Sequence, residues 1–192
     1  MILLFAIILG FGVGSIPWGY IIAKTIKKID IREYGSGNIG TTNVWRVCGK
    51  RLGILAFVLD FSKSAIPVLL IHNYFGLNTA ILCGVGTMLG HSFTPWLKFK
   101  GGKGVATGLG AFVGLVPIEA VITFCVWVLV LIFTKWVSVA SLSAAAVLVI
   151  LIFLSHHSSP IFWFGLAGFV LVVVLHRSNI KRLMQGKEPK IK

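Results

Sequence analysis

Long apolar runs dominate this sequence and limit what it can fold into. An α-helix needs about 20 mostly apolar residues to cross the hydrocarbon core of a bilayer. Five apolar runs are candidate spans: residues 2–23, 52–72, 77–97 and 136–155, each of 20 residues or more, and the shorter run 160–175. Hydrophobic residues make up 57% of the 192 residues and charged residues 12%, against roughly 45–50% and ~25% in soluble domains. We therefore expect an all-α membrane protein.

A sixth apolar block, residues 104–134, is interrupted only at residues 117–119. At ~1.5 Å per residue it is about 46 Å long, too long for one crossing of ~30 Å and short for two. Basic residues favour the cytoplasmic side. If the block turns at 117–119, every Lys and Arg except Lys63 falls on one side, and the connections 73–76, 117–119 and 156–159 contain none. We therefore predict a single domain over residues 1–192 with seven transmembrane helices, the N-terminus outside and the C-terminus cytoplasmic.

The composition also excludes several classes of partner. The chain has 18 Lys and Arg against 5 Asp and Glu, a net charge of +13. Nucleic acid is a poor partner because binding it requires a hydrated basic face, whereas most residues of this chain are hydrophobic. Three widely spaced cysteines form no CxxC pair, so we expect no disulfide framework, no metal and no cofactor. The first apolar run has no basic residues before it and is interpreted as a retained span.

Pairs of glycines recur four residues apart within the spans. They are Gly10 and Gly14, Gly86 and Gly90, Gly104 and Gly108, and Gly110 and Gly114. Small residues at this spacing allow membrane helices to approach closely. We interpret these pairs as packing faces.

Gly35, Gly37 and Gly40 form a literal GxGxxG, and Asp60 stands 20 residues beyond Gly40. A dinucleotide site with this pattern needs a preceding buried strand and a βαβ unit. Residues 27–34 are polar and Asp60 lies within a span, so that interpretation fails. A phosphate-binding P-loop fails too, because Thr41 occupies the place of its lysine.

The same glycines can still form an anion site, because glycine permits positive φ and lets successive N–H groups converge. Arg46 adds a guanidinium suited to phosphate oxygens. Polar side chains between the glycines add further hydrogen-bonding groups: Ser36, Asn38, Thr41, Thr42 and Asn43. A flexible polar linker is the alternative, but linkers rarely concentrate Gly, Asn and Thr beside an Arg and a Trp.

A second glycine segment contains Lys100, Gly101, Gly102, Lys103 and Gly104 and leads into the fourth predicted span. Free N–H groups at a helix N-terminus attract anions, so this segment is a second candidate anion site. The alternative is that its lysines only determine topology.

A third segment, residues 176–188, follows the last span. His176 and Asn179 share one face if the helix continues. The alternative to a functional segment is a basic helix end that rests on anionic lipid. This alternative accounts well for Lys181 and Arg182 but less well for His176 and Asn179.

Four polar residues within the spans are also candidates. Asp60 and Lys63 lie three residues apart, where unpaired charge is costly, so they either pair or contact a ligand. His91 is more simply a buried packing histidine. Ser141 could contribute a donor, although serine in membrane helices usually bonds to a backbone carbonyl.

Three segments in this order on a seven-span plan resemble the bacterial acyl-phosphate:glycerol-3-phosphate acyltransferase family over the whole chain. The resemblance implies transfer of a fatty acyl group from acyl phosphate to the 1-hydroxyl of sn-glycerol 3-phosphate, giving lysophosphatidic acid at the cytoplasmic face of the bacterial inner membrane. It implies that Ser36 and Arg46 are needed for activity and that the second segment binds glycerol 3-phosphate. It further implies that His176 and Asn179 contribute to the active site and that Glu188 is structural.

Soluble-type glycerol-phosphate acyltransferases use an HxxxxD pair, which this sequence lacks. Acyl phosphate is already activated, so positioning and charge stabilisation can carry the reaction. We expect the leaving phosphate to accept the hydroxyl proton while Arg46, Lys103 and backbone N–H groups hold the anions. Ser36 as a covalent nucleophile is the alternative mechanism. The alternative function is an organophosphate transporter or exporter, although transporters commonly carry repeats and sites near the bilayer midplane.

Overall fold

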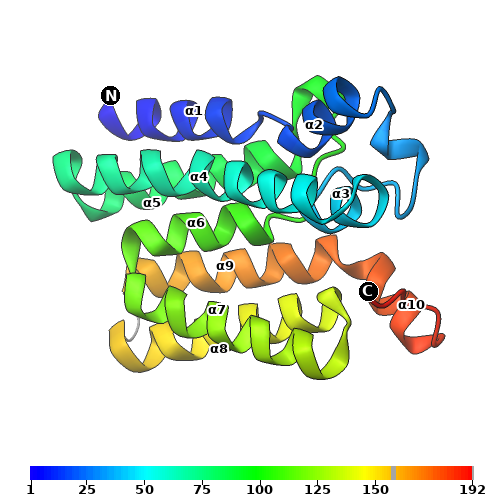
Figure 1. Cartoon of the computed structure of the whole chain (residues 1–192). Helices are drawn as coiled ribbons and strands as arrows, with labels where there is room; N and C mark the ends of the chain where they lie inside the picture. Colours follow the sequence, from blue (N-terminus) through cyan, green and yellow to red (C-terminus); the bar gives the residue numbers. More distant parts are fainter. Residues whose placement is uncertain (157–158, 192) are drawn as a thin grey trace. The chain divides into compact units, whose positions relative to one another are not determined.

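The computed structural model describes residues 1–156 and 159–191, and within these ranges it contains helices and no strands (Figure 1). The all-α prediction is confirmed. The chain divides into two compact units, residues 1–115 and 116–192, which are described separately. The helices of the first unit are α1 (Ile2–Gly14), α2 (Trp18–Ile26), η1 (Ile31–Glu33), α3 (Thr41–Cys48), α4 (Lys50–Phe75), α5 (Leu77–Ser92), η2 (Pro95–Leu97) and α6 (Val105–Leu115).

In the first unit, α1, α4, α5 and α6 run side by side, and α2 and α3 lie beyond one end of them (Figure 1). The glycine pairs explain how closely α1 approaches α5. A Cβ atom on Gly10 or Gly14 would collide with the α5 backbone, and one on Gly86 or Gly90 would collide with the α1 backbone. Gly110 of α6 lies equally close to the α4 backbone. The packing interpretation is confirmed for these pairs.

The first predicted span, residues 2–23, is broken in the structure. Helix α1 ends at Gly14 and α2 begins at Trp18. Pro17 has no N–H to donate, and it disfavours helical geometry at Ile16. Ile16 therefore lies outside both helices, and its carbonyl accepts hydrogen bonds from the Trp18 N–H at 3.1 Å and from Lys63 Nζ at 2.8 Å. The Thr94 hydroxyl donates to the Ser15 carbonyl at 2.6 Å, so the break is held by both α4 and the segment after α5.

The long apolar block is also broken, as predicted, but slightly earlier. Helix α6 ends at Leu115 and α7 (Pro117–Thr134) begins at Pro117. Residues 117–119 form the first turn of α7, not a connection, because proline is well suited to the first helical position. The break falls at Val116.

The second unit contains α7, α8 (Val137–His156), α9 (Pro160–Leu175) and α10 (Arg177–Met184). Helices α7, α8 and α9 run side by side, and α10 departs from α9 at an angle of 56° (Figure 1). Helix α9 therefore does not continue through His176 and Asn179, the condition under which the two residues were expected to share one face. The predicted connection 156–159 includes residues 157 and 158, which lie outside the described residues.

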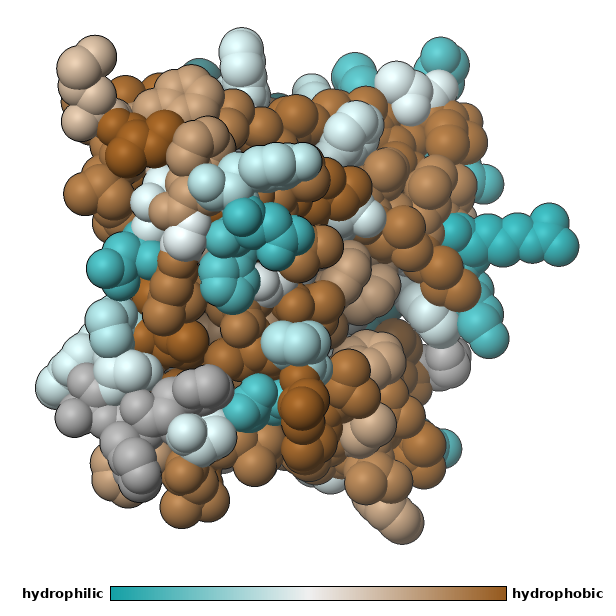
Figure 2. Space-filling model, turned by 90° about the vertical axis from the view of Figure 1, so that its left-hand side faces the viewer, coloured by the Kyte–Doolittle hydropathy of each residue, from teal (hydrophilic) through white to brown (hydrophobic). Residues whose placement is uncertain are grey.

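The surface of the described chain is rich in apolar side chains. Figure 2 shows a face on which they predominate. Large apolar residues are more than half exposed on five helices: Ile8, Ile66, Leu129, Ile150 and Val170. Four helices of the described residues are long and apolar enough to cross a membrane, or five if the bent pair α9 and α10 counts as one. Helices α5 and α6 are shorter, with 16 and 11 residues.

Candidate functional site

The first glycine segment, residues 35–43, forms a tight loop between η1 and α3 over residues 35–40 and continues into the first turn of α3. Gly35 and Gly37 have φ of +61° and +69°, values at which other residues are strained. The segment follows a short 3-10 helix, not a strand, so exclusion of a dinucleotide fold is confirmed. Gly40 precedes α3, and Thr41 and Thr42 form its first turn. The loop therefore leads directly into a helix N-terminus, where N–H groups can receive an anion.

A small apolar core holds this loop from beneath. Ile31 and Val44 are fully buried, and Ile39 is nearly so. Ile31 lies in η1 and Val44 in α3, so the core joins the two elements that flank the loop. Ser36, by contrast, is exposed at the loop surface, where its hydroxyl can meet a ligand.

Asn43 fixes the conformation of the loop. Its Oδ1 accepts a hydrogen bond from the Ser36 N–H at 2.9 Å. Its Nδ2 donates to the carbonyls of Ile31 at 3.2 Å and Tyr34 at 3.0 Å. The side chain is almost wholly buried. All three of these hydrogen bonds are made with backbone groups around the loop. The sequence suggested Asn43 as a ligand donor, whereas the structure gives it a scaffolding role.

Asn38 joins the two glycine segments. Its Oδ1 accepts from the Gly40 N–H at 2.9 Å, and its Nδ2 donates to the Gly101 carbonyl at 3.2 Å. Residues 63 positions apart in the sequence are thus brought into contact. The sequence offered no signal for this contact, because any of the polar residues in the first segment could have made it.

The second glycine segment is folded back against the end of α5. The Gly101 N–H donates to the Ser92 carbonyl and the Gly102 N–H to the His91 carbonyl, each at 3.0 Å. A Cβ atom at Gly101 would collide with the His91 carbonyl, and one at Gly102 with the His91 ring. The Gly-Gly pair is therefore required for this close approach. Gly104 has φ of +75° and immediately precedes α6.

The basic side chains of these segments differ in exposure. Lys100 is exposed, whereas Lys103 and Arg46 are half-buried. Arg46 lies on α3 three residues after Asn43, so the two share one helix face. Among the described residues, the hydroxyls of Thr41, Ser92 and Thr107 are buried without a hydrogen-bond partner. Buried polar groups left in this way need an explanation, and a ligand or water near the loops would supply one.

Asp60 and Lys63 pair with each other within α4. Lys63 Nζ lies 2.8 Å from Asp60 Oδ1 and 3.0 Å from His91 Nδ1. All three residues are almost wholly buried. Of the two alternatives left open by the sequence, the structure favours pairing over ligand contact.

In the second unit, His176 stands at the bend between α9 and α10, and Asn179 lies on α10. Both are almost wholly buried. His176 Nδ1 lies 2.8 Å from the Val172 carbonyl oxygen. A carbonyl can only accept, so Nδ1 carries the proton and, in the neutral ring, Nε2 is the acceptor nitrogen.

Glu188 binds the C-terminal tail to this region. Its carboxylate accepts hydrogen bonds from Asn179 Nδ2 at 2.6 Å, the Ser138 hydroxyl at 2.8 Å and Arg182 Nε at 2.7 Å. The Trp136 indole also donates to the Glu188 carbonyl at 3.1 Å. Glu188 thus holds Asn179 in place while tying the tail to the start of α8. The sequence carried one faint signal for this hub, an isolated acid in a basic tail.

Ser141 accepts a hydrogen bond from the Trp127 indole at 3.2 Å, which joins α8 to α7. It is almost wholly buried. The sequence offered Ser141 as a donor, with a bond to a backbone carbonyl as the usual alternative. In the structure its hydroxyl oxygen instead accepts a hydrogen bond between two helices.

The Glu188 contacts predict a pH dependence of stability. Burial alone would raise the pKa of Glu188, but the hydrogen bonds from Asn179, Ser138 and Arg182 outweigh it and hold that pKa below its usual value. A carboxyl with a lowered pKa in the folded state contributes stability above its unfolded pKa, and that contribution is lost as the pH falls through the folded pKa.

We expect the melting temperature of purified protein to fall as the pH drops below about 4.5, and to fall less in Glu188→Gln than in the wild type. Glu33→Gln, at an exposed carboxylate, is the matched control and should follow the wild-type profile. Identical pH profiles for the wild type and Glu188→Gln would contradict the assignment.

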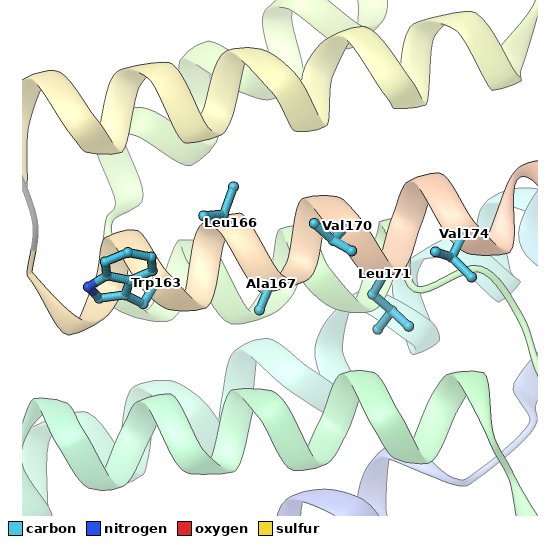
Figure 3. Close-up of a pocket in the computed structure, with 6 residues that line it drawn as sticks. All are labelled: Trp163, Leu166, Ala167, Val170, Leu171 and Val174. Carbon is cyan, nitrogen blue, oxygen red and sulfur yellow. The ribbon is translucent and has the colours of Figure 1, made fainter.

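Helix α9 presents an open apolar hollow of about 450 Å³ on the second unit (Figure 3). Its lining comes from one helix: Trp163, Leu166, Ala167, Val170, Leu171 and Val174. Such a surface suits a hydrocarbon chain and offers little to a polar ligand. Among residues 1–156 and 159–191, no three His, Cys, Asp or Glu side chains gather as a metal site.

Comparisons with known proteins cover nearly the whole chain. A family model described as glycerol-3-phosphate acyltransferase matches residues 4–186. A glycerol-3-phosphate acyltransferase of Fusobacterium nucleatum is 42% identical over 188 residues, covering 97% of this chain and 96% of the relative. One of Aquifex aeolicus is 38% identical over 187 residues, covering 96% and 97%.

Two crystal structures of PlsY (YgiH), an integral membrane glycerol 3-phosphate acyltransferase, share the fold. The glycerol 3-phosphate form has a TM-score of 0.95 at 37% identity and covers 99% of this chain and 96% of that one. The lysophosphatidic acid form has a TM-score of 0.92 at 36% identity, with coverage of 99% and 95%.

Proposed function

The chain belongs to the glycerol-3-phosphate acyltransferase family, and we propose that it transfers a fatty acyl group from acyl phosphate to the 1-hydroxyl of sn-glycerol 3-phosphate. The products are lysophosphatidic acid and inorganic phosphate. The observation that carries this proposal is the contact between the two glycine segments through Asn38 and Gly101, which places two helix N-termini and their basic residues in one unit. Two phosphate-bearing substrates require such a pair of anion sites.

The reaction needs little covalent chemistry from the protein. The 1-hydroxyl oxygen attacks the acyl carbonyl carbon, the bond from that carbon to the phosphate oxygen breaks, and the departing phosphate takes the hydroxyl proton. Arg46, Lys103 and the N–H groups at the starts of α3 and α6 bind the phosphates and the developing oxyanion. The remaining groups of the two segments complete the substrate-binding surface: Gly37, Asn38, Gly40, Thr41, Thr42, Lys100, Gly101, Gly102 and Gly104.

Ser36 binds phosphate in this scheme and does not become acylated. Its hydroxyl is exposed, and within the first unit, residues 1–115, no hydrogen bond joins it to a histidine or carboxylate that could act as an activating base. Direct attack by the substrate hydroxyl therefore agrees better with the geometry than an acyl-serine intermediate.

His176 and Asn179 serve the same reaction. The hydrogen bond from His176 to Val172 sets the tautomer of the ring, and Glu188 orients the amide of Asn179. Both side chains are therefore held in one arrangement before substrate arrives, which is what catalysis by positioning requires.

We also propose that the chain is one domain with seven crossings of a bacterial cytoplasmic membrane, made by α1 with α2, by α4 and by α5–α9. The N-terminus lies outside, and the glycine segments and C-terminus face the cytoplasm. The charge distribution supports this topology, because the connections predicted outside contain no Lys or Arg. Cysteine placed at Asn73 should react with an impermeant maleimide in intact cells, and cysteine placed at Lys190 only after permeabilisation; the reverse result would overturn the orientation.

Acyl transfer by purified protein in detergent tests the function. No sealed compartment exists there, so transport cannot account for product. With acyl phosphate and glycerol 3-phosphate, lysophosphatidic acid should form in proportion to the enzyme added. Absence of product, together with uptake of glycerol 3-phosphate by the same protein in liposomes, would replace the enzyme with a transporter.

A further inference from the structure

A cluster of buried charge in the first unit lies beneath the second glycine segment. Asp60 and Lys63 come from α4 and His91 from the end of α5. The side chains of Asp60, Lys63 and His91 are 2%, 3% and 5% exposed. Charge buried this deeply is expensive and persists only where it is fully paired.

The Lys63 ammonium is surrounded by three protein groups. It lies 2.8 Å from Asp60 Oδ1 as an ion pair, donates to the Ile16 carbonyl at 2.8 Å, and lies 3.0 Å from His91 Nδ1. An ammonium group cannot accept a hydrogen bond, so His91 Nδ1 must accept and the proton of the neutral ring lies on Nε2. The contacts of Lys63 are thus made inside the protein, with α4, α5 and the residue before Pro17.

His91 connects this cluster to the loop. Its backbone carbonyl accepts the Gly102 N–H at 3.0 Å, and its ring packs so closely on Gly102 that a Cβ atom there would collide with it. The next residue along the chain is Lys103. The orientation of the His91 ring therefore determines where the backbone before Lys103 can lie.

We propose that Lys63 is a positioning residue for the substrate phosphate: by holding His91, it sets the place of the loop that carries Lys103. The break before α2 contributes directly, because Ile16 lies outside the helices there and its carbonyl accepts a hydrogen bond from Lys63. The proposal rests on the proposed function, since its readout is the binding of glycerol 3-phosphate, the substrate that the family resemblance assigns to this segment.

The double variant Asp60→Asn/Lys63→Met tests the proposal, because it removes both charges together. A buried ion pair replaced by neutral groups of similar size often leaves stability unchanged. We expect the melting temperature to stay near that of the wild type, while the KM for glycerol 3-phosphate rises about tenfold and the KM for acyl phosphate changes much less. A wild-type KM for glycerol 3-phosphate in a well-folded double variant would overturn the proposal.

His91→Gln provides a second test if the double variant does not fold. The glutamine oxygen can still accept from Lys63, but the ring that packs on Gly102 is gone. The KM for glycerol 3-phosphate should again rise about tenfold. An unchanged KM would show that the ring does not position the loop.

Ser64→Ala is the matched control. Ser64 is the residue after Lys63 and shares a hydrogen bond of 2.6 Å with Thr87, so it links the same two helices without contacting the loop. This variant should lower the melting temperature and leave both KM values unchanged. If it raises the KM for glycerol 3-phosphate as much as the double variant does, general loosening of α4 and α5 explains the effect and the positioning role is wrong. If the wild type itself forms no lysophosphatidic acid, the proposed function fails instead.

Discussion

Replacing Asn43 with aspartate should lower kcat/KM by about 100-fold or more. Asparagine and aspartate have nearly the same shape, and the Ser36 N–H keeps its acceptor. The change removes the two hydrogen bonds that Nδ2 donates and places a carboxylate oxygen against the carbonyls of Ile31 and Tyr34. Each buried group left unsatisfied costs about 1–3 kcal/mol, so the loop should leave the conformation that holds phosphate.

Initial rates of lysophosphatidic acid formation, with each substrate varied in turn, measure this effect. Asn73→Asp is the matched control, because it makes the same chemical change at an exposed position near the end of α4. It should retain wild-type kinetics. If Asn43→Asp keeps kcat/KM within about threefold of the wild type, a difference of less than 1 kcal/mol, the loop does not depend on Asn43 and the scaffold described above is wrong.

His176→Asn should lower kcat by about 100-fold and leave both KM values little changed. The asparagine amide can still donate to the Val172 carbonyl, in place of Nδ1, but it has no counterpart of Nε2. The loss therefore reports on Nε2 alone.

His176→Gln makes the complementary change, because the longer glutamine side chain can bring its amide oxygen toward the position of Nε2. We expect it to retain more kcat than His176→Asn. If the asparagine variant is the more active of the two, the bond to Val172 matters more than the acceptor at Nε2, and Nε2 is not the reactive nitrogen.

The predictable part of this fold follows from forces that act locally along the chain. Apolar runs of spanning length gave the helices, and α9 has the predicted bounds, Pro160–Leu175. The glycine pairs of α1 and α5 were interpretable as contact faces because close approach needs small residues at helical spacing. The break at Ile16–Pro17 was missed because the apolar run continues through it, and hydropathy does not register a missing N–H.

The candidate site was less accessible to sequence reasoning, because its geometry depends on long-range contacts. The sequence singled out the polar residues within 35–43 as a group but did not predict their separate contacts: Asn43 holds the backbone, and Asn38 reaches Gly101. Likewise, the spacing of Asp60 and Lys63 suggested a pair, but the third partner on α5 and the carbonyl at the helix break appear only once the chain is folded. Glu188 stands out as an isolated acid in a basic tail, but nothing local indicates that it binds Ser138, 50 positions away.

The central claim is direct acyl transfer by positioning, and the dependence of phosphate release on the acceptor tests it most directly. Purified enzyme in detergent is mixed with acyl phosphate, with and without glycerol 3-phosphate, and inorganic phosphate, lysophosphatidic acid and the mass of the protein are followed together. The account predicts equal amounts of phosphate and lysophosphatidic acid when both substrates are present, and neither phosphate release nor a change of protein mass with acyl phosphate alone. A burst of phosphate without acceptor, accompanied by an acyl adduct on Ser36, would contradict it.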